Sequence, residues 1–119
     1  MPGAVLVVDD DPLFRGLVRR MLLAEGLHVV GEAGSVAAAL EAAHALRPNA
    51  ALVDVGLPDG DGVSLARELT SLPWRMRVVL ISSDPQAASE RDVRDAGAGA
   101  FVPKDDLLNV PLERLLISG

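Results

Sequence analysis

The chain has 119 residues, half of them hydrophobic, which predicts one domain over residues 1–119 with a core of its own and argues against disorder. Its net charge of −6 argues against direct binding of nucleic acid by this domain, and the lack of cysteine excludes disulfides and thiolate metal sites. No apolar run approaches the roughly 18 residues of a membrane span, and the acids after the first apolar run do not fit a signal peptide, so we expect a cytoplasmic protein without a membrane partner.

Short apolar runs alternate with helical patterns along the chain. Ala4–Val8 is a continuous apolar run of the kind found in strands that are buried on both faces. Pro12–Ala24 carries apolar residues on one stripe and arginines on the other, which predicts an amphipathic helix that Asp11 caps. The remaining predicted elements are strands over Leu27–Ala33, Ala50–Val55, Arg77–Ser82 and Ala100–Pro103, and helices over Ser35–Leu46, Val63–Ser71, Gln86–Ala96 and Val110–Ser118.

Five strands and five helices in alternation predict an α/β fold, a doubly wound five-stranded parallel sheet with right-handed crossovers. We assume the flavodoxin-like strand order 2-1-3-4-5, in which the first and third strands are neighbours where the strand order reverses. Ligands of such sheets bind outside the carboxyl ends of the strands at that point. The residues at the strand ends are therefore the first candidates for function.

Four of the five predicted strands lead into side chains that can do chemistry: Asp9 and Asp10, Asp54, Ser82, and Lys104. Because converging carboxylates repel one another, three acids at one edge of a sheet need a counter-charge. Lys104, the single lysine among eleven basic residues, supplies one positive charge, and a site of hard oxygen ligands suits Mg²⁺. With those charges neutralising phosphoryl oxygens, Asp54 could attack phosphorus as a nucleophile.

Four motifs fall at these strand ends, in the order VLVVDD, LVDVGLPDGDG, VVLISS and GAGAFVPK. With them the chain resembles the receiver domains of two-component response regulators over essentially its whole length. The resemblance implies that Asp54 is the phosphoacceptor and that Asp9 and Asp10 form the acidic pair that binds Mg²⁺, with Asp10 the more direct ligand. It also implies that the backbone carbonyl of Gly56 completes the protein part of the metal shell.

The resemblance assigns further roles, and the sequence departs from the family pattern at some of these positions. Ser82 stands where many receivers have Thr, as the hydroxyl that turns toward the phosphoryl group, and Lys104 is the ion-pairing lysine. Phe101 occupies the position of the switch aromatic, which is commonly Tyr. Gly56 and Asp84 lie where the family tunes the lifetime of the phosphoryl group. Lys104 is followed by Asp and not by Pro, so no cis peptide is expected at that bond.

By the same resemblance, the domain accepts its phosphoryl group from phosphohistidine on a sensor histidine kinase or a phosphotransfer protein, and slowly hydrolyses it. His28 and His44 fall in a predicted strand and helix away from the site, so the donor must come from elsewhere. Phosphorylation is expected to shift the face formed by the fourth helix, the fifth strand and the fifth helix, and to favour a homodimer. The segments VVDDDPLFR and VVGEAGS resemble receivers that are joined to helix-turn-helix DNA-binding domains.

The loop after the third strand offers an alternative, a calcium-binding EF-hand. Asp59, Asp61, Gly62 and Glu68 fall at the third, fifth, sixth and twelfth positions of such a loop, but Leu57 occupies the first ligand position and a strand precedes it. The two aspartates are therefore expected to form turns.

Two further alternatives concern the whole domain. A Mg²⁺-dependent phosphatase of the haloacid dehalogenase type also has Asp-x-Asp after its first strand, as in Asp9–Asp11, but Leu13 departs from that pattern and the chain is short for it. A degenerate receiver that acts only as a constitutive protein-interaction module is the alternative from a different class. The intact set of acids, serine and lysine argues against that module.

Overall fold

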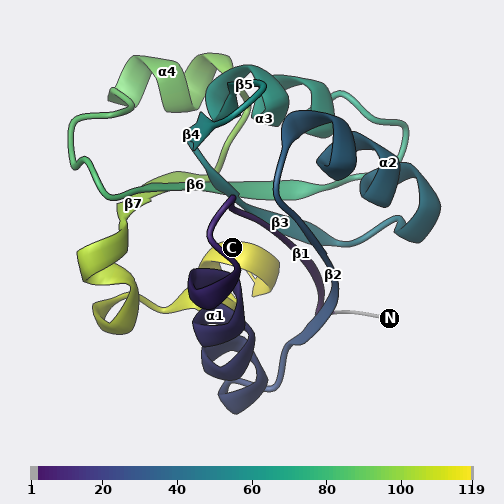
Figure 1. Cartoon of the computed structure of the whole chain (residues 1–119), viewed down its shortest axis with the longest axis vertical. Helices are drawn as coiled ribbons and strands as arrows, with labels where there is room; N and C mark the ends of the chain where they lie inside the picture. The colour runs from purple at the N-terminus through teal and green to yellow at the C-terminus, as the bar shows by residue number, and fades with distance from the viewer. Residues whose placement is uncertain (1–2, 119) are drawn as a thin grey trace.

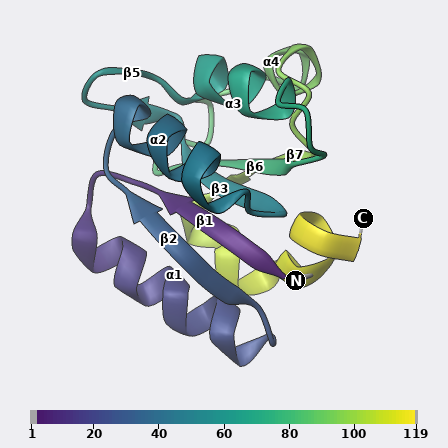
Figure 2. The same cartoon turned by 90° about the vertical axis from the view of Figure 1, so that its right-hand side faces the viewer.

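The computed structural model describes residues 3–118 and has a central five-stranded sheet with helices on both faces (Figures 1 and 2). All neighbouring strands of this sheet are parallel, and their order is β2-β1-β3-β6-β7. Counted within the sheet this is the order 2-1-3-4-5, so the predicted doubly wound, flavodoxin-like fold is confirmed. The strands are β1 (Ala4–Val8), β2 (His28–Ala33), β3 (Ala50–Asp54), β6 (Arg77–Ser82) and β7 (Ala100–Pro103).

The helices form one layer on each side of the sheet, as both views show. One layer contains α2 (Val36–Leu46), α3 (Gly62–Thr70) and α4 (Glu90–Asp95). The other contains α1 (Pro12–Ala24), the 3₁₀ helix η1 (Lys104–Asn109) and the π-type helix η2 (Arg114–Ser118). Among residues 3–118 no helix has the length and apolar character that a membrane crossing requires.

The core lies on both faces of the sheet because successive side chains of a strand point to opposite faces. In β1, Leu6 and Val8 belong to the cluster under α2 and α3, whereas Val5 and Val7 belong to the cluster under α1 and η2. These four side chains are completely buried. Because β1 is buried on both faces, its sequence is a continuous apolar run and does not alternate between apolar and polar residues.

Three segments differ from the sequence-based expectation. The fourth helix begins at Glu90 and not near Gln86, because Ser89 and Asp92 form a capping box that sets its first turn. The final helical segment begins at Leu112, and η1, which was not predicted, precedes it. The loop after β3 contains a short antiparallel hairpin, β4 (Gly56–Leu57) and β5 (Gly60–Asp61). Other boundaries differ by a residue, and no cis peptide occurs within residues 3–118.

Gly62 lets the hairpin close tightly against the end of β3. Its amide donates to the carbonyl of Val55 at 2.8 Å. A Cβ at this position would lie 2.1 Å from the carbonyl oxygen of Asp54 and 2.7 Å from Cα of Val55, both of which are backbone atoms. Glycine is therefore required here by the close approach of two backbone segments.

We expect Gly62→Ala to lower the free energy of unfolding by about 1–3 kcal/mol or more, since the backbone has to shift to make room for a methyl group. The measurement is urea unfolding followed by circular dichroism. Gly16→Ala is the matched control, because the added Cβ meets nothing within 4 Å in the middle of α1. It should be neutral or stabilising by up to about 1 kcal/mol. Equal stability of the two variants would contradict the close-approach argument.

Candidate functional site

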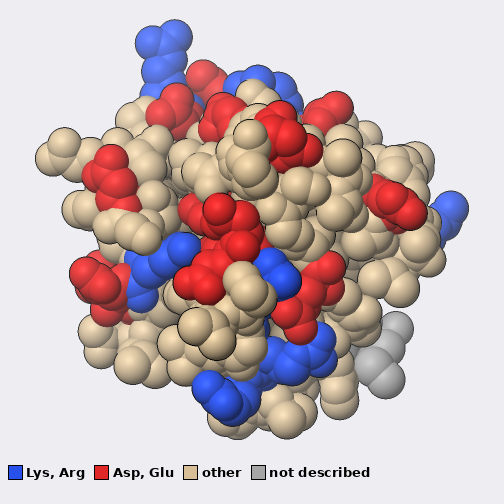
Figure 3. Space-filling view, viewed as in Figure 1, with Lys and Arg blue, Asp and Glu red and all other residues tan. Residues whose placement is uncertain are grey.

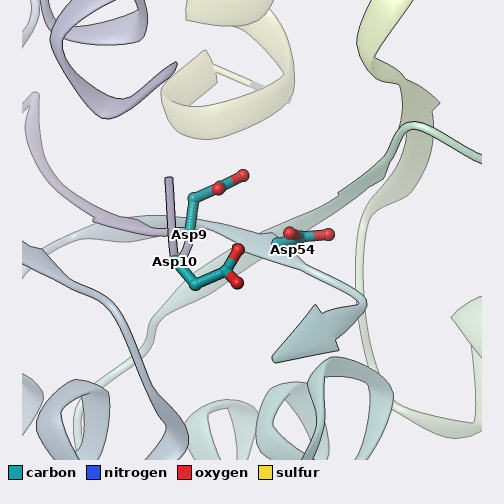
Figure 4. A group of neighbouring side chains, drawn as sticks. All are labelled: Asp9, Asp10 and Asp54. Carbon is teal, nitrogen blue, oxygen red and sulfur yellow. The ribbon is translucent and has the colours of Figure 1, made fainter. Parts of the chain in front are cut away.

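Three carboxylates meet at the carboxyl ends of β1 and β3. Asp9 and Asp10 follow β1 directly, Asp54 is the last residue of β3, and the two strands are neighbours with Val8 opposite Val53. One oxygen from each of the three carboxylates lies within 4.8 Å of the others (Figure 4). Asp9 is completely buried, Asp54 is 7 % exposed, and Asp10 is exposed. The predicted convergence of these acids is confirmed.

Lys104 provides the counter-charge at this site. It begins η1 immediately after β7, and its Nζ lies 2.6 Å from Oδ2 of Asp9 and 3.5 Å from Oδ2 of Asp54. Burial by itself would lower the pKa of Lys104, but the ion pairs with Asp9 and Asp54 outweigh burial and raise it above its ordinary value. The ammonium group is therefore held in its charged form between two acids.

The surroundings of Asp54 favour a basic carboxylate. Burial, followed by the nearby charge of Asp9, raises the pKa of Asp54 above its ordinary value, while Lys104 and the amide of Gly56 act in the opposite direction. The Gly56 amide donates to Oδ1 of Asp54 at 3.2 Å. Without the charge of Lys104, burial and the charge of Asp9 would both disfavour the ionised form of Asp54. The amide of Gly56 would then be the one remaining group that favours it.

The turn after β1 is held by its own hydrogen bonds. The Asp9 amide donates to the carbonyl of Ala33 at 2.9 Å, and Oδ1 of Asp9 accepts from the amide of Asp11 at 2.9 Å. Asp11 in turn caps α1, since its carboxylate accepts from the amide of Leu13 at 3.0 Å. The capping role predicted for Asp11 is confirmed. Oδ2 of Asp9 is buried and accepts no well-aligned hydrogen bond within the described part of the chain. Its polar contact among those residues is the ion pair with Nζ of Lys104.

Ser82 and Asp84 lie at the same edge of the sheet. Asp54 pairs with Ile81 in the β3–β6 register, so Ser82 is one residue beyond it. Ser82 is 8 % exposed, and its hydroxyl accepts from the amide of Asp84 at 3.0 Å. The Asp84 carboxylate accepts from the amide of Gln86 at 2.9 Å. The hydroxyl is thus engaged with its own loop in this state.

Phe101 lies on β7, two strands away from β3, which carries Asp54. It is half-buried and, together with Val93 of α4 and Ala88 before it, lines a pocket of about 280 Å³ under α4. No side chain of α4 itself is fully buried. The aromatic ring therefore borders a space beneath a lightly packed helix.

Asp59 and Asp61 accept hydrogen bonds at the N-terminal ends of two helices. The carboxylate of Asp59 accepts from the amides of Val36 and Ala37, at 2.7 and 3.1 Å, at the start of α2. Those two bonds, the first to Val36, lower the pKa of Asp59 below its ordinary value. Asp61 caps α3 by accepting from the amide of Val63 at 3.0 Å. The expectation of turn-forming residues is confirmed for the hairpin, but the reach of Asp59 to a second helix was not predicted.

Two residues of α1 contact the site although the sequence did not single them out. The ring of Phe14 lies under the ammonium group of Lys104, with 4.2 Å from Nζ to the ring centre. Nη1 of Arg15 donates to the backbone carbonyl of Asp9 at 2.5 Å. Side chains of a helix point back toward its N-terminus, so the first turn of α1 directs its side chains toward the Asp9–Asp11 segment. This position in the sequence is the signal that could have identified Phe14 and Arg15.

Charge is distributed unevenly over the face that carries the site. Acidic side chains gather near the centre of this face, where Figure 1 places the turn between β1 and α1, and basic side chains border them (Figure 3). The two histidines lie elsewhere, as expected: His28 begins β2, and the ring of His44 in α2 makes an edge-to-face contact with Trp74, with 6.0 Å between ring centres. Neither belongs to the acidic cluster.

Comparison with known proteins gives a consistent result. The family model of the response regulator receiver domain matches residues 5–110. The chain is 42% identical over 105 residues to the DNA-binding transcriptional activator DevR/DosR of Mycobacterium tuberculosis, covering 88% of this chain and 48% of that protein. It is 33% identical over 109 residues to BvgA of Bordetella pertussis, a putative positive transcription regulator of virulence factors, covering 92% and 52%.

A solved structure agrees with these matches. The signal receiver domain of the putative response regulator NarL from Mycobacterium tuberculosis superposes with a TM-score of 0.72 and 40% identity, over 87% of this chain and 85% of that one. The chain spans about half the length of the curated relatives DevR/DosR and BvgA. The functions of the remaining half of DevR/DosR and BvgA belong to those relatives and are not carried over to this chain.

Proposed function

The chain belongs to the response regulator receiver family, and we propose that Asp54 is the residue that accepts the phosphoryl group in this phosphorylation-activated switch. The observation that carries the proposal is the arrangement at the end of β3. A nearly buried carboxylate stands beside two further acids, and an ammonium group lies 3.5 Å from it. A carboxylate nucleophile and a fixed cation are what phosphoryl transfer to a protein requires.

In the proposed reaction, an Asp54 carboxylate oxygen forms a bond to phosphorus while the bond from phosphorus to the donor's imidazole nitrogen breaks. The electron pair of that bond leaves with the imidazole, and the product is an acyl phosphate on Asp54. Burial and the charge of Asp9 make the carboxylate more basic than an exposed one, which favours attack. Lys104 stands where it can pair with the incoming phosphoryl oxygens.

The donor set fits a hard divalent cation, since three carboxylates converge and the buried Oδ2 of Asp9 has charge but no aligned hydrogen bond. We propose that Asp9, Asp10, Asp54 and the backbone carbonyl of Gly56 hold Mg²⁺. When bound, Mg²⁺ supplies positive charge that neutralises phosphoryl oxygens. In its absence Lys104 is the residue, among those the structure describes, that forms ion pairs with Asp9 and Asp54.

Ser82, Lys104 and Phe101 would convert the new charge into a change of surface. A phosphorylated side chain adds about −1.5 to −2 charges at neutral pH. Lys104 would then shift from Asp9 toward the phosphoryl group, and the Ser82 hydroxyl would leave the amide of Asp84 for the same group. Phe101 has room to move into the pocket beneath α4. The face that changes is the one formed by α4, β7 and η2.

The lifetime of the phosphoryl group is proposed to depend on two neighbours of the site. Gly56 offers no side chain to shield or orient a water molecule, and it is exposed. Asp84 brings a negative charge two residues beyond Ser82. Slow hydrolysis of the acyl phosphate returns the domain to its resting state.

The proposed donor is phosphohistidine on a sensor histidine kinase or a phosphotransfer protein, and the phosphorylated form is proposed to favour a homodimer. DevR/DosR is a DNA-binding transcriptional activator and is about twice as long as the stretch it shares with this chain. DNA binding is therefore proposed to belong to an output domain and not to this acidic one, and a cytoplasmic location remains a prediction.

We expect incubation with a small phosphodonor such as acetyl phosphate and Mg²⁺ to add one phosphoryl group, detected by intact mass spectrometry. Chelation of the metal with EDTA should prevent the gain, because the phosphoryl oxygens then have only Lys104 and not the divalent cation as counter-charge. A parallel reaction with Ca²⁺ in place of Mg²⁺ tests whether the gain in mass depends on which divalent metal is bound. No gain with Mg²⁺, and no stabilisation by Mg²⁺ in thermal unfolding, would leave the constitutive interaction module as the better description.

A further inference from the structure

We propose that Arg15 is a positioning residue that fixes the peptide between Asp9 and Asp10 and thereby sets the direction of the Asp10 carboxylate. The inference deepens the proposed function, because it rests on the magnesium site proposed above. Arg15 lies in the first turn of α1, and its side chain is 19 % exposed. Its Nη1 donates to the backbone carbonyl of Asp9 at 2.5 Å.

Asp10 needs such support more than Asp9 does. The side chain of Asp9 is held on both oxygens, by the Asp11 amide and by the Lys104 ammonium, and its backbone amide is bonded to β2. The carboxylate of Asp10 is exposed and has no hydrogen bond or ion pair among residues 3–118. Its direction therefore depends on the backbone that precedes it.

A peptide group is planar, so fixing the carbonyl oxygen of Asp9 also fixes the amide nitrogen of Asp10. The guanidinium of Arg15 holds that carbonyl from the side of α1 and β2. An exposed ligand whose backbone is fixed in advance loses less conformational entropy when a cation binds. This is the physical route by which a residue outside the acidic cluster can change cation affinity.

The guanidinium is itself held in place. Its Nε donates to Oε1 of Glu32 at 3.0 Å, and Arg19, one turn further along α1, donates to the other oxygen of Glu32 from Nη2 at 2.6 Å and from Nε at 3.0 Å. The hydrogen bond from Arg19, opposed by burial and joined by the bond from Arg15, lowers the pKa of Glu32. Glu32 therefore stays ionised and offsets part of the positive charge that Arg15 brings near a cation site.

Gly34 leaves the space that the guanidinium occupies. A Cβ at this position would lie 3.3 Å from Nη1 of Arg15 and 3.9 Å from the carbonyl oxygen of Asp9. Three segments thus meet around one planar group: the first turn of α1, the end of β2, and the peptide between the two acids. A planar fork can contact the carboxylate and the carbonyl at once, whereas an ammonium group cannot do so in the same way.

The test is calorimetric titration of Mg²⁺ into the whole chain for the wild type, Arg15→Gln, Arg15→Lys and Arg19→Gln. We expect Arg15→Gln to weaken Mg²⁺ binding about tenfold, as for other residues that orient a ligand, and Arg15→Lys to do the same. Arg19→Gln is the matched control: it also removes an ion pair to Glu32 but touches neither acid, and it should stay within about twofold of the wild type. Phosphorylation of Arg15→Gln should be slow at low Mg²⁺ and recover at saturating Mg²⁺.

Binding by Arg15→Gln within about twofold of the wild type would overturn the proposal, as would full recovery in Arg15→Lys or an equal loss in Arg19→Gln. Circular dichroism verifies that each variant is folded. If Arg15→Gln is not, Gly34→Ala gives a milder displacement of the same guanidinium and should weaken binding about two- to threefold. A wild type that binds no Mg²⁺ would refute the magnesium site itself, which separates that failure from a failure of the role of Arg15.

Discussion

Asp54→Asn is expected to abolish the gain of a phosphoryl group that the wild type shows with a small phosphodonor and Mg²⁺. Asparagine has nearly the same shape, and its amide oxygen can still accept from the amide of Gly56, but an amide is not a nucleophile toward phosphorus. We expect the rate of phosphorylation, followed by intact mass, to fall at least about a hundredfold, the scale on which loss of a reacting group acts.

The same substitution should make the metal-free protein more stable. It removes one of three carboxylates whose oxygens lie within 4.8 Å, and burial and the charge of Asp9 already raise the pKa of Asp54. A gain on the order of 1 kcal/mol in the free energy of unfolding is typical when a functional group that destabilises the fold is removed. Lost phosphorylation together with higher stability cannot be attributed to misfolding.

Asp59→Asn is the matched control for Asp54→Asn. It changes an acid five residues further on that caps α2 and lies outside the acidic cluster. This variant should lose some stability, because an amide caps the Val36 and Ala37 amides less well, yet still accept one phosphoryl group. Phosphorylation that persists in Asp54→Asn, or that is lost only in Asp59→Asn, would show that the phosphoacceptor is elsewhere.

The parts of the fold that follow from burial were predictable from the sequence. β1, β6 and α1 have the predicted boundaries, because a strand buried on both faces needs an uninterrupted apolar run and α1 has a clear stripe. The edge strand β7 also has its predicted boundaries, although only Val102 in it is fully buried. The order of the strands was an assumption, because an alternation of strands and helices is compatible with more than one order. Once that order holds, the carboxyl ends of β1 and β3 must meet, so the three acids and Lys104 were found from residue type and position alone.

What the sequence did not predict depends on local capping and on contacts distant in sequence. The fourth helix starts at Glu90 because a serine and an aspartate cap it there, against an apolar pattern that favours an earlier start. Asp59 reaches α2 across 23 residues, which no local pattern encodes. Phe14 and Arg15 contact the site only because of the rotation of α1 about its axis, and that rotation is set by packing against β1 and β2.

The second large effect is expected for Lys104→Met, which removes the counter-charge and keeps most of the side chain's length. Asp9 is completely buried, and Lys104 is its charged partner among residues 3–118. Removing one member of a buried ion pair leaves an uncompensated charge, which costs about 3–5 kcal/mol; since the lysine side chain is 17 % exposed, we expect about 2–3 kcal/mol. Urea unfolding in the presence of EDTA measures this loss.

Arg91→Met is the matched control for Lys104→Met, because it removes the ion pair with Asp95 at 3.7 Å on the exposed surface of α4. That change should alter the free energy of unfolding by no more than about 0.5 kcal/mol.

Mg²⁺ should narrow the stability difference between Lys104→Met and the wild type, since a bound cation neutralises the same acids. Phosphorylation should remain slow by at least about tenfold even with Mg²⁺, because the variant has no ammonium group to pair with the phosphoryl oxygens. A metal-free Lys104→Met as stable as the wild type would mean that the acids do not need this lysine, and the electrostatic account of the site would be wrong.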